Sequence, residues 1–433
     1  MQVSVERNEL KCRMTIGFPK QHLEQEIEKR IKEIARTRKF DGFRPGKVPA
    51  RVIQQRYGQQ VREDALDEIA RKNFQAAVTQ EKLHPAGYPS IEFKDEPDSA
   101  EMALIADFEV YPEISEIKLD SIQVEKLSSE VTETDVDNMI NKLRDQRKTW
   151  QTVDRAAQDK DRLSIDFEGV LEGESEPFNG GSSKDYPLVL GSNSFIPGFE
   201  SALVGINVGE TRDVKVTFPE DYDAAMAGKN ATFKVTANSV SEPVLPEITE
   251  QFIQSFGVKD GTLENLRKEV RNNMQRELSY TLKSKLKQQV MDNLLAANEI
   301  PIPDSLVEEE AQRLRDSFEK NMRGQGYQGQ MNLPIDHFKE NAFKRVKLGI
   351  LLSEIVSKNG LRPDSQKVRE AIEAIAATYE EQEEVIKWFY SNQENLRDVE
   401  NTVIEEQVVE WILERVQVTE KTVNFSDIMD KQK

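Results

Sequence analysis

The chain has 433 residues, of which 32% are charged and 37% are hydrophobic, and its formal net charge is −19. This length predicts about three domains with real hydrophobic cores, and the acidity excludes a protein that coats nucleic acid, except through a local basic patch. The single cysteine, Cys12, excludes a disulfide framework and a thiolate metal cluster, and its place in an alternating apolar segment predicts a small buried side chain.

The N-terminal sequence MQVSVERNELKC has no apolar core of the kind that a signal peptide needs. No apolar run in the chain approaches the roughly 18 residues of a membrane-spanning helix. We therefore expect a cytoplasmic protein with no membrane partner.

Residues 1–112 carry the pattern of an α+β domain. Apolar residues alternate with other residues in 10–16 and again in 102–110, which is typical of half-buried strands. Between these segments, apolar residues keep helical spacing in 23–34 and, after Pro49, in 61–83. The segment around residues 40–49 is therefore a predicted connection between two helices.

This connection contains the octapeptide GFRPGKVP, residues 42–49, which has the properties of a docking loop. Its glycines permit conformations closed to other residues and its prolines fix φ, so Phe43 cannot readily withdraw into a helix or strand. Residues 29–56 hold ten Lys and Arg side chains against only Glu33 and Asp41. A run of charge is often only a solvated face, but a constrained aromatic at its centre favours a binding surface.

The octapeptide resembles the ribosome-binding signature of the trigger factor family, bacterial chaperones that meet nascent chains. Many family members carry Phe-Arg-Lys at this tip, whereas this chain has Pro45 in the third position, which leaves open the cation that contributes most. The resemblance implies contact with the large ribosomal subunit near the peptide exit. The residues implied in this contact are Phe43, Arg44, Gly46 and Lys47.

Residues 113–150 form a predicted linker with a helix over 131–150, which Thr134 could cap. Residues 151–243 then change character, with short apolar runs and clustered glycines. They predict a compact β-rich domain with strands at 163–170, 186–190, 211–218 and 231–240.

This β-rich segment resembles the FKBP-type prolyl isomerases through IDFEG, LGSNSFIPGFESALVG and the pair VTFPEDY and ATFKV. Such sites use no nucleophile, metal or cofactor. Rotation about an X-Pro bond breaks amide resonance against a barrier of ~18–20 kcal/mol, and an apolar pocket with a backbone donor favours the twisted amide.

By matching positions, the resemblance implies that the Ile196 N–H donates to a substrate carbonyl. The implied pocket residues are Phe167, Phe178, Tyr186, Phe195, Ile196, Phe199, Tyr222 and, behind them, Phe233. A domain of this size also needs aromatic residues for its core, so Phe167 and Phe233 could serve only that purpose. Asn179 stands where many stand-alone enzymes of this type carry an acidic residue, which leaves the isomerase rate open.

Residues 244–433 have helical spacing throughout and predict an all-α domain, with helices at about 262–298, 335–358, 365–375, 379–390 and 395–415. Ser305 and Glu308 predict a capping box at the start of a further helix after Pro303. Glycines interrupt the helices at 322–331, where flexible apolar side chains are suited to many partners. The candidate client-binding residues are Met322, Tyr327 and Met331, although Met residues at helical spacing more often belong to a core.

The other sequence patterns exclude several classes of site. The three histidines have no further ligand at metal spacing, and the sequence has neither a P-loop nor a dinucleotide fingerprint. We therefore expect no metal, no cofactor and no ATP-driven cycle.

The expected fold is a multidomain α+β protein, with an α+β ribosome-binding domain, an FKBP-like β-rich domain and an all-α C-terminal domain. The resemblance implies an ATP-independent, ribosome-associated chaperone that shields nascent and unfolded polypeptides and isomerises X-Pro bonds. We expect the protein to bind no DNA. The resemblance is compatible with a weak homodimer of the free protein. The alternatives are a free FKBP-type isomerase or a holdase without ribosome docking; a general RNA-binding protein is disfavoured by the net acidity.

Overall fold

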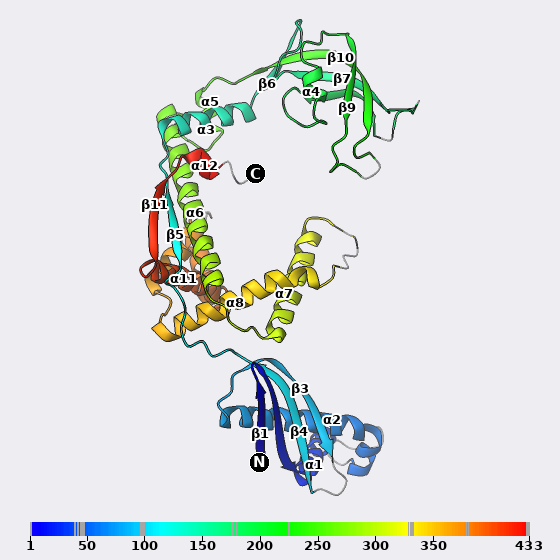
Figure 1. Cartoon of the computed structure of the whole chain (residues 1–433), viewed down its shortest axis with the longest axis vertical. Coiled ribbons are helices and arrows are strands. Elements are labelled where there is room, and N and C mark those ends of the chain that lie inside the picture. The colour runs from blue at the N-terminus through cyan, green and yellow to red at the C-terminus, as the bar shows by residue number, and fades with distance from the viewer. Residues whose placement is uncertain are drawn as a thin grey trace. The chain divides into compact units, whose positions relative to one another are not determined.

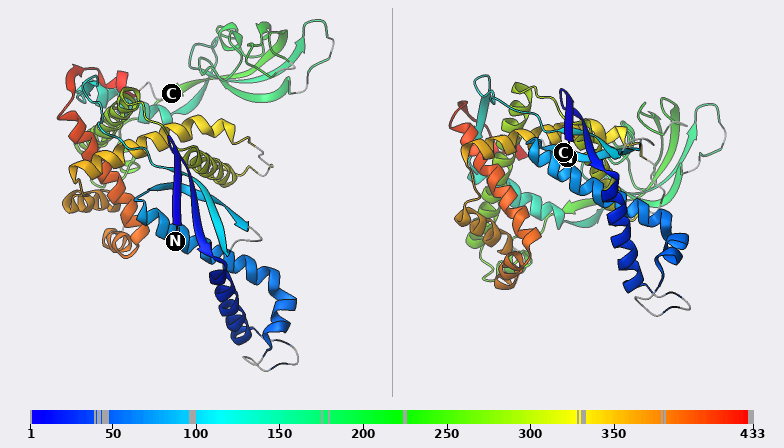
Figure 2. Two further views of the ribbon diagram at one scale, coloured as in Figure 1. Left: turned by 60° about the horizontal axis from the view of Figure 1, so that its bottom comes forward. Right: turned by 90° about the horizontal axis from the view of Figure 1, so that it is seen from below.

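The computed structural model describes residues 2–38, 40, 43, 48–95, 100–174, 176–178, 180–223, 226–327, 329, 333–377, 379 and 381–429. The chain divides into two units, one formed by residues 1–126 and 284–421 and the other by residues 127–283 and 422–433. Figures 1 and 2 show the helices and strands that make up these units. The multidomain α+β architecture is confirmed. Among the described residues, no helix is both long enough and apolar enough to cross a membrane.

The first unit contains a four-stranded antiparallel sheet of order β1-β2-β4-β3. Its strands are β1 (Gln2–Asn8), β2 (Lys11–Pro19), β3 (Pro85–Asp95) and β4 (Glu101–Val110). The two predicted strands are β2 and β4, which pair in register with Ile16 opposite Leu104, both fully buried. Helices α1 (Lys20–Thr37) and α2 (Ala50–Gln80) add Leu23 and Ile69 to the same core, as their apolar spacing predicts.

Cys12 lies on β2 and is 2% exposed, so it is a buried side chain as predicted. Burial raises the pKa of its thiol, which keeps the sulfur protonated and unreactive. We expect the disulfide reagent DTNB to label Cys12 at least about 100-fold more slowly in the native protein than in urea. Equal labelling rates would show that the sheet opens without global unfolding.

The remainder of the first unit is mainly helical. It contains the C-terminal part of α6 (Leu263–Ala297) and the helices α7 (Asp304–Gly324), α8 (Asp336–Asn359), α9 (Ser365–Ala376), α10 (Gln382–Ser391) and α11 (Gln393–Leu413). Leu294, Leu351 and Ile412 are fully buried in one core shared by α6, α8 and α11. The helical prediction for this region is confirmed. The sequence did not predict β11 (Gln417–Thr422), which pairs with β5 (Gln123–Ser128).

The predicted capping box at Ser305 is wrong. Helix α7 begins at Asp304 with Pro303 at its N-cap and has no side-chain cap. The Ser305 hydroxyl donates instead to Glu109 Oε2 at 2.7 Å and to the carbonyl oxygen of Ala86 at 3.0 Å. The Ser305 N–H also donates to Glu109 Oε2, at 2.8 Å, so a carboxylate of the sheet takes the place that Glu308 would have in a capping box.

The second unit begins with α3 (Glu133–Gln146), which packs with α5 (Glu250–Gln254) and the first part of α6. Thr132 caps α3, rather than Thr134, because Thr132 and Asp135 form a reciprocal capping box. The helix is also shorter than predicted, since the chain turns at Arg147 and continues as strand β6 (Thr149–Val153). Helix α12 (Phe425–Met429) contributes Phe425 to this core.

The second unit also contains a five-stranded sheet in which β6, β10, β7 and β8 lie in that order and β9 pairs with β10. The further elements of this module are β7 (Arg162–Leu171), β8 (Ser182–Val189), α4 (Phe199–Ala202), β9 (Thr211–Thr217) and β10 (Asn230–Val244). The strands predicted from 163 to 240 are confirmed. Side chains from β7, α4 and β10 form one core, which includes Phe167, Phe199 and Phe233.

Candidate functional site

The predicted docking loop lies between α1 and α2. The two aromatic residues described in this connection, Phe40 and Phe43, differ in their exposure to solvent. Phe43 is 40% exposed, whereas Phe40 is buried. The Phe43 N–H donates to the Phe40 carbonyl oxygen at 3.1 Å, and the two residues form an isolated antiparallel bridge. The structure thus places Phe43 outside the core, as predicted. Arg44, Gly46 and Lys47 lie outside the described residues.

A small core of its own supports this loop. Phe40 packs there with Ile31 and Ile53 from the two helices. The Phe40 ring meets Tyr57 edge-on, with centroids 5.9 Å apart, and the Arg38 guanidinium lies 5.1 Å from the Tyr57 centroid. Sequence reasoning missed Phe40 and Tyr57, although their apolar bulk beside a cationic loop was a usable signal. Together they join α1, the loop and α2 into one support.

The predicted isomerase residues form a continuous cluster of rings. Phe167 on β7 contacts Tyr186, Phe195, Phe199 and Phe233, with centroid distances of 5.9, 5.6, 6.4 and 6.1 Å. The Phe195 and Phe199 rings stack at 4.6 Å. Tyr186 is 38% exposed and Phe195 is half-buried, whereas Phe199 is fully buried. The exposure of the rings therefore decreases from Tyr186 and Phe195, which form an accessible rim, to Phe199, which forms a buried floor.

The cluster continues through one residue that the sequence analysis did not select. Phe178 meets Phe233 at 5.9 Å and Phe218 at 5.8 Å, and Phe218 lies 4.9 Å from Tyr222. Phe218 is buried and links the exposed Tyr222 to the other rings. It lies within the VTFPEDY segment, so the segment that carried the resemblance also contained this signal.

Gly169, the last residue of IDFEG, makes room for these rings. It pairs with Phe233 across β7 and β10. A Cβ added at Gly169 would lie 2.5 Å from a ring carbon of Phe233 and 2.9 Å from one of Phe178. A larger side chain at this position would displace both rings.

The proposed donor, the Ile196 N–H, lies in the loop between β8 and α4. The carbonyl oxygen of Ile196 accepts a hydrogen bond from the Phe199 N–H at 3.0 Å. In the part of the chain that the structure describes, the Ile196 N–H itself has no hydrogen-bond acceptor. The Ile196 side chain packs against the buried core. This residue thus combines an available donor with an apolar contact.

Two carboxylates fix the backbone around the cluster: Asp166 binds residues of β8 and β10, and Glu200 binds the loop that follows β8. Asp166 accepts from the Asp185 N–H and from Asn238 Nδ2, each at 2.7 Å, and the backbone bond is the main cause of its lowered pKa. Burial raises the pKa of Glu200, but hydrogen bonds from the 192–195 loop together lower it below the ordinary value. These bonds stabilise the fold at neutral pH, and their contribution is lost as the pH falls through the lowered pKa.

The predicted client-binding tip begins within the last turn of α7, which ends at Gly324. Met322 is half-buried on the helix, while Tyr327 is 48% exposed and its N–H donates to the Met322 carbonyl oxygen at 3.1 Å. Met331 lies outside the described residues. Phe318 and Phe343 are also exposed on α7 and α8 and were not among the predicted residues.

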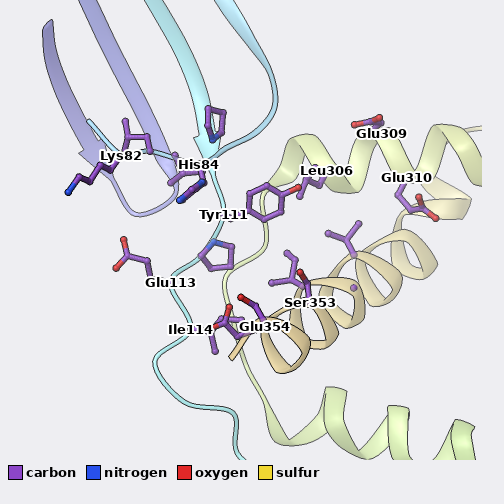
Figure 3. Close-up of a pocket in the computed structure, with 18 of the residues that line it drawn as sticks. Lys82, His84, Tyr111, Glu113, Ile114, Leu306, Glu309, Glu310, Ser353 and Glu354 are labelled. Atoms are coloured by element: carbon purple, nitrogen blue, oxygen red, sulfur yellow. The ribbon is translucent and has the colours of Figure 1, made fainter. Parts of the chain in front are cut away.

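A cavity of about 950 Å³ lies elsewhere in the first unit, lined by residues of 82–85, 110–114, α7 and α8 (Figure 3). Tyr111, Leu306 and Ile350 give it apolar walls, and Glu309 and Glu310 add carboxylates. Glu310 forms an ion pair, at 2.9 Å, with Arg345, which does not line the cavity. The sequence analysis did not anticipate this cavity.

Among the described residues, no group of three or more His, Cys, Asp and Glu side chains is arranged to hold a metal ion. The geometry of the aromatic cluster offers apolar surfaces and a backbone donor.

Comparison with known proteins gives consistent matches along the chain. Residues 1–143 match the family "Bacterial trigger factor protein (TF)", residues 153–238 match "FKBP-type peptidyl-prolyl cis-trans isomerase", and residues 262–414 match "Bacterial trigger factor protein (TF) C-terminus". A curated trigger factor of Pseudomonas putida (strain GB-1) is 47% identical over 99% of this chain and 97% of its own length. One from Pseudomonas syringae pv. syringae (strain B728a) is 46% identical over 99% of this chain and 98% of its own.

A solved structure titled "Promiscuous Substrate Recognition in Folding and Assembly Activities of the Trigger Factor Chaperone" is 19% identical in sequence. It aligns with 96% of this chain and 100% of its own, with a TM-score of 0.51. The two chains share the overall fold.

Proposed function

The chain belongs to the trigger factor family, and from this premise we propose how its parts divide the work of a ribosome-associated chaperone and prolyl isomerase. Residues 1–112 dock on the ribosome, and 113–150 connect them to the isomerase of 151–243. Residues 244–433 hold unfolded polypeptide. The protein works in the cytoplasm, partly bound to ribosomes.

Docking is assigned to the loop of Phe43, Arg44, Gly46 and Lys47. The observation that supports it most is the exposed Phe43 above a separate buried core. Such an exposed aromatic can enter a small apolar pocket, while neighbouring cations meet RNA phosphate or acidic protein. The proposed surface is that of the large subunit near the peptide exit. This location, and a weak homodimer of the free protein, are supported by family membership alone.

Isomerisation is assigned to the aromatic cluster. The accessible rim of Tyr186 and Phe195 would receive the proline ring, and the buried Phe199 would form the floor. An apolar surface disfavours the polar planar amide relative to the twisted form, and the Ile196 N–H would hold a substrate carbonyl during rotation. No proton has to be transferred, so these rings and one donor supply what the reaction needs.

Client shielding is assigned to Met322, Tyr327 and Met331 and to the helices that carry them. Exposed aromatic side chains on α7 and α8 support this assignment, since apolar contacts that are weak and distributed suit many sequences. The mixed apolar and charged lining of the large cavity could accept a few side chains of an unfolded chain in the same way. Release would then need no nucleotide.

The test of docking is co-sedimentation with purified 70S ribosomes over a salt series. We expect the triple change Phe43→Ala, Arg44→Ala and Lys47→Ala to weaken binding at least about tenfold and to reduce the salt dependence by about one unit of slope for each cation removed. Tyr88→Ala is the matched control. Tyr88 is 94% exposed and also belongs to residues 1–112, but it lies on β3 and not in the docking loop.

Equal binding by the triple variant and the wild type would move the interface away from this loop. No binding by any of the chains would favour a free isomerase or holdase.

A further inference from the structure

One buried carboxylate organises the loop before Ile196. Glu200 Oε1 accepts from the backbone N–H groups of Ser194 at 2.8 Å and Phe195 at 3.2 Å, and Oε2 accepts from that of Asn193 at 3.0 Å. The hydroxyls of Ser192 and Ser194 also donate to Oε1, at 3.1 and 3.3 Å. Glu200 is only 8% exposed. Five donors of one short segment therefore converge on a single side chain.

Apolar packing fixes only part of this loop, through the side chains of Phe195 and Ile196. A cavity of about 170 Å³ lies against it, lined by Gly191, Pro197 and Val204 as well as by the Glu200 side chain. Asn193 has φ of 54°, a left-handed conformation that a non-glycine residue adopts at some cost. A loop with a cavity on one side and a strained residue within it needs polar contacts to keep one conformation.

The same turn of chain joins this carboxylate to the aromatic floor. Phe199 precedes Glu200 on α4 and is fully buried against Phe167 and Phe233. Phe195 is bound to Glu200 through its N–H, and the Ile196 carbonyl is bound to Phe199. The donor at Ile196 is therefore held from both sides by two consecutive residues of α4.

We propose that Glu200 is a positioning residue of the isomerase, which aims the Ile196 N–H and the Phe195 ring at the bound X-Pro segment. The inference rests on the proposed function of the aromatic cluster. A donor that is already oriented needs no reorganisation when the amide twists. Misplacement of such a group by about 1 Å can lower a rate by about 10²-fold.

The test compares Glu200→Gln with Glu210→Gln in the full chain. Glu210 is the matched control, because its carboxylate also accepts the backbone N–H of a turn, that of Asn207 at 3.0 Å, and also binds Arg212. In either variant the amide keeps one acceptor oxygen and turns an NH₂ group toward the former donors. The assay is isomerisation of a chromogenic tetrapeptide that contains one X-Pro bond.

For Glu200→Gln we expect kcat/KM to fall by about 10- to 100-fold. The loss should lie mainly in kcat, because the rings that bind the ground state remain. Glu210→Gln should stay within about twofold of the wild type. Amide NMR signals of Phe195 and Ile196 should shift in Glu200→Gln alone, and amide hydrogen exchange in β7 and β10 should change by similar amounts in both variants.

Equal activity loss in the two variants would assign the effect to general destabilisation and would overturn the role of Glu200. Full activity of Glu200→Gln with displaced amide signals would overturn it as well. A wild-type chain without activity on the peptide would instead contradict the proposed function together with this inference, so the two failures are distinguishable.

Discussion

Changing Phe195 to alanine should reduce kcat/KM for X-Pro isomerisation by about 100-fold while ribosome binding stays unchanged. Phe195 is half-buried, stacks on Phe199 and meets Tyr186 edge-on at 5.4 Å, so its removal opens one wall of the apolar surface. The floor beneath it remains. The measurement is the tetrapeptide assay on the full chain, beside 70S co-sedimentation of the same preparation.

Val208→Ala is the control for this variant, because Val208 is 45% exposed in the same module and contributes no ring to the cluster. Protection of an unfolded protein from aggregation should be equal in both variants and the wild type. If Phe195→Ala also lost ribosome binding, the proposed separation of docking from isomerisation would be contradicted.

Phe199→Ala should destabilise the isomerase module itself, by about 3–5 kcal/mol. Phe199 is 0% exposed and contacts Phe167, Phe195 and Phe233, so alanine would leave a cavity that the packed sheet cannot close. Because the chain has several folded parts, one global midpoint does not report this change. Amide hydrogen exchange in β7 and β10 of the full chain does.

Phe199→Leu is the graded control, since leucine fills part of the same volume and should cost less than the alanine change. Exchange in α1 and α2 should be unaffected in both variants. Unchanged protection of β7 and β10 in Phe199→Ala would mean that Phe199 is not part of the core. Because Phe199→Ala is expected to destabilise the module, a loss of isomerase activity in this variant reflects unfolding of the module as well as any change in the pocket.

The strongly periodic elements could be predicted from the sequence, because alternation and helical spacing reflect which face is buried. Ile16 and Leu104 followed that rule. The β11 strand could not be found in this way, since all six of its residues are exposed and it pairs with β5, a strand far away in the sequence. The cap of α3 also depended on a choice between two threonines two positions apart.

The site was predictable where the resemblance named rings, and less so where polar contacts define it. The aromatic residues came together. Phe218 was missed because the resemblance gave it no role, and Glu200 because only rings and one backbone donor had been given roles. Ser305 shows the converse error. Its spacing to Glu308 is that of a capping box, yet Glu109 on a distant strand supplies the acceptor. Hydrogen bonds between residues far apart in sequence have no local pattern to reveal them.

The division of the chain into two interleaved units has a consequence for its own synthesis. Residues 1–126 share a unit with 284–421, and 127–283 share one with 422–433. At 5–20 residues per second, translation of the stretch between the two parts of the first unit takes on the order of 10–30 s. The N-terminal sheet and its helices can form early. The core shared by α6, α8 and α11 can form only after α11 has left the ribosome. A chaperone of nascent chains is thus itself a nascent chain that completes its fold only at the end of translation.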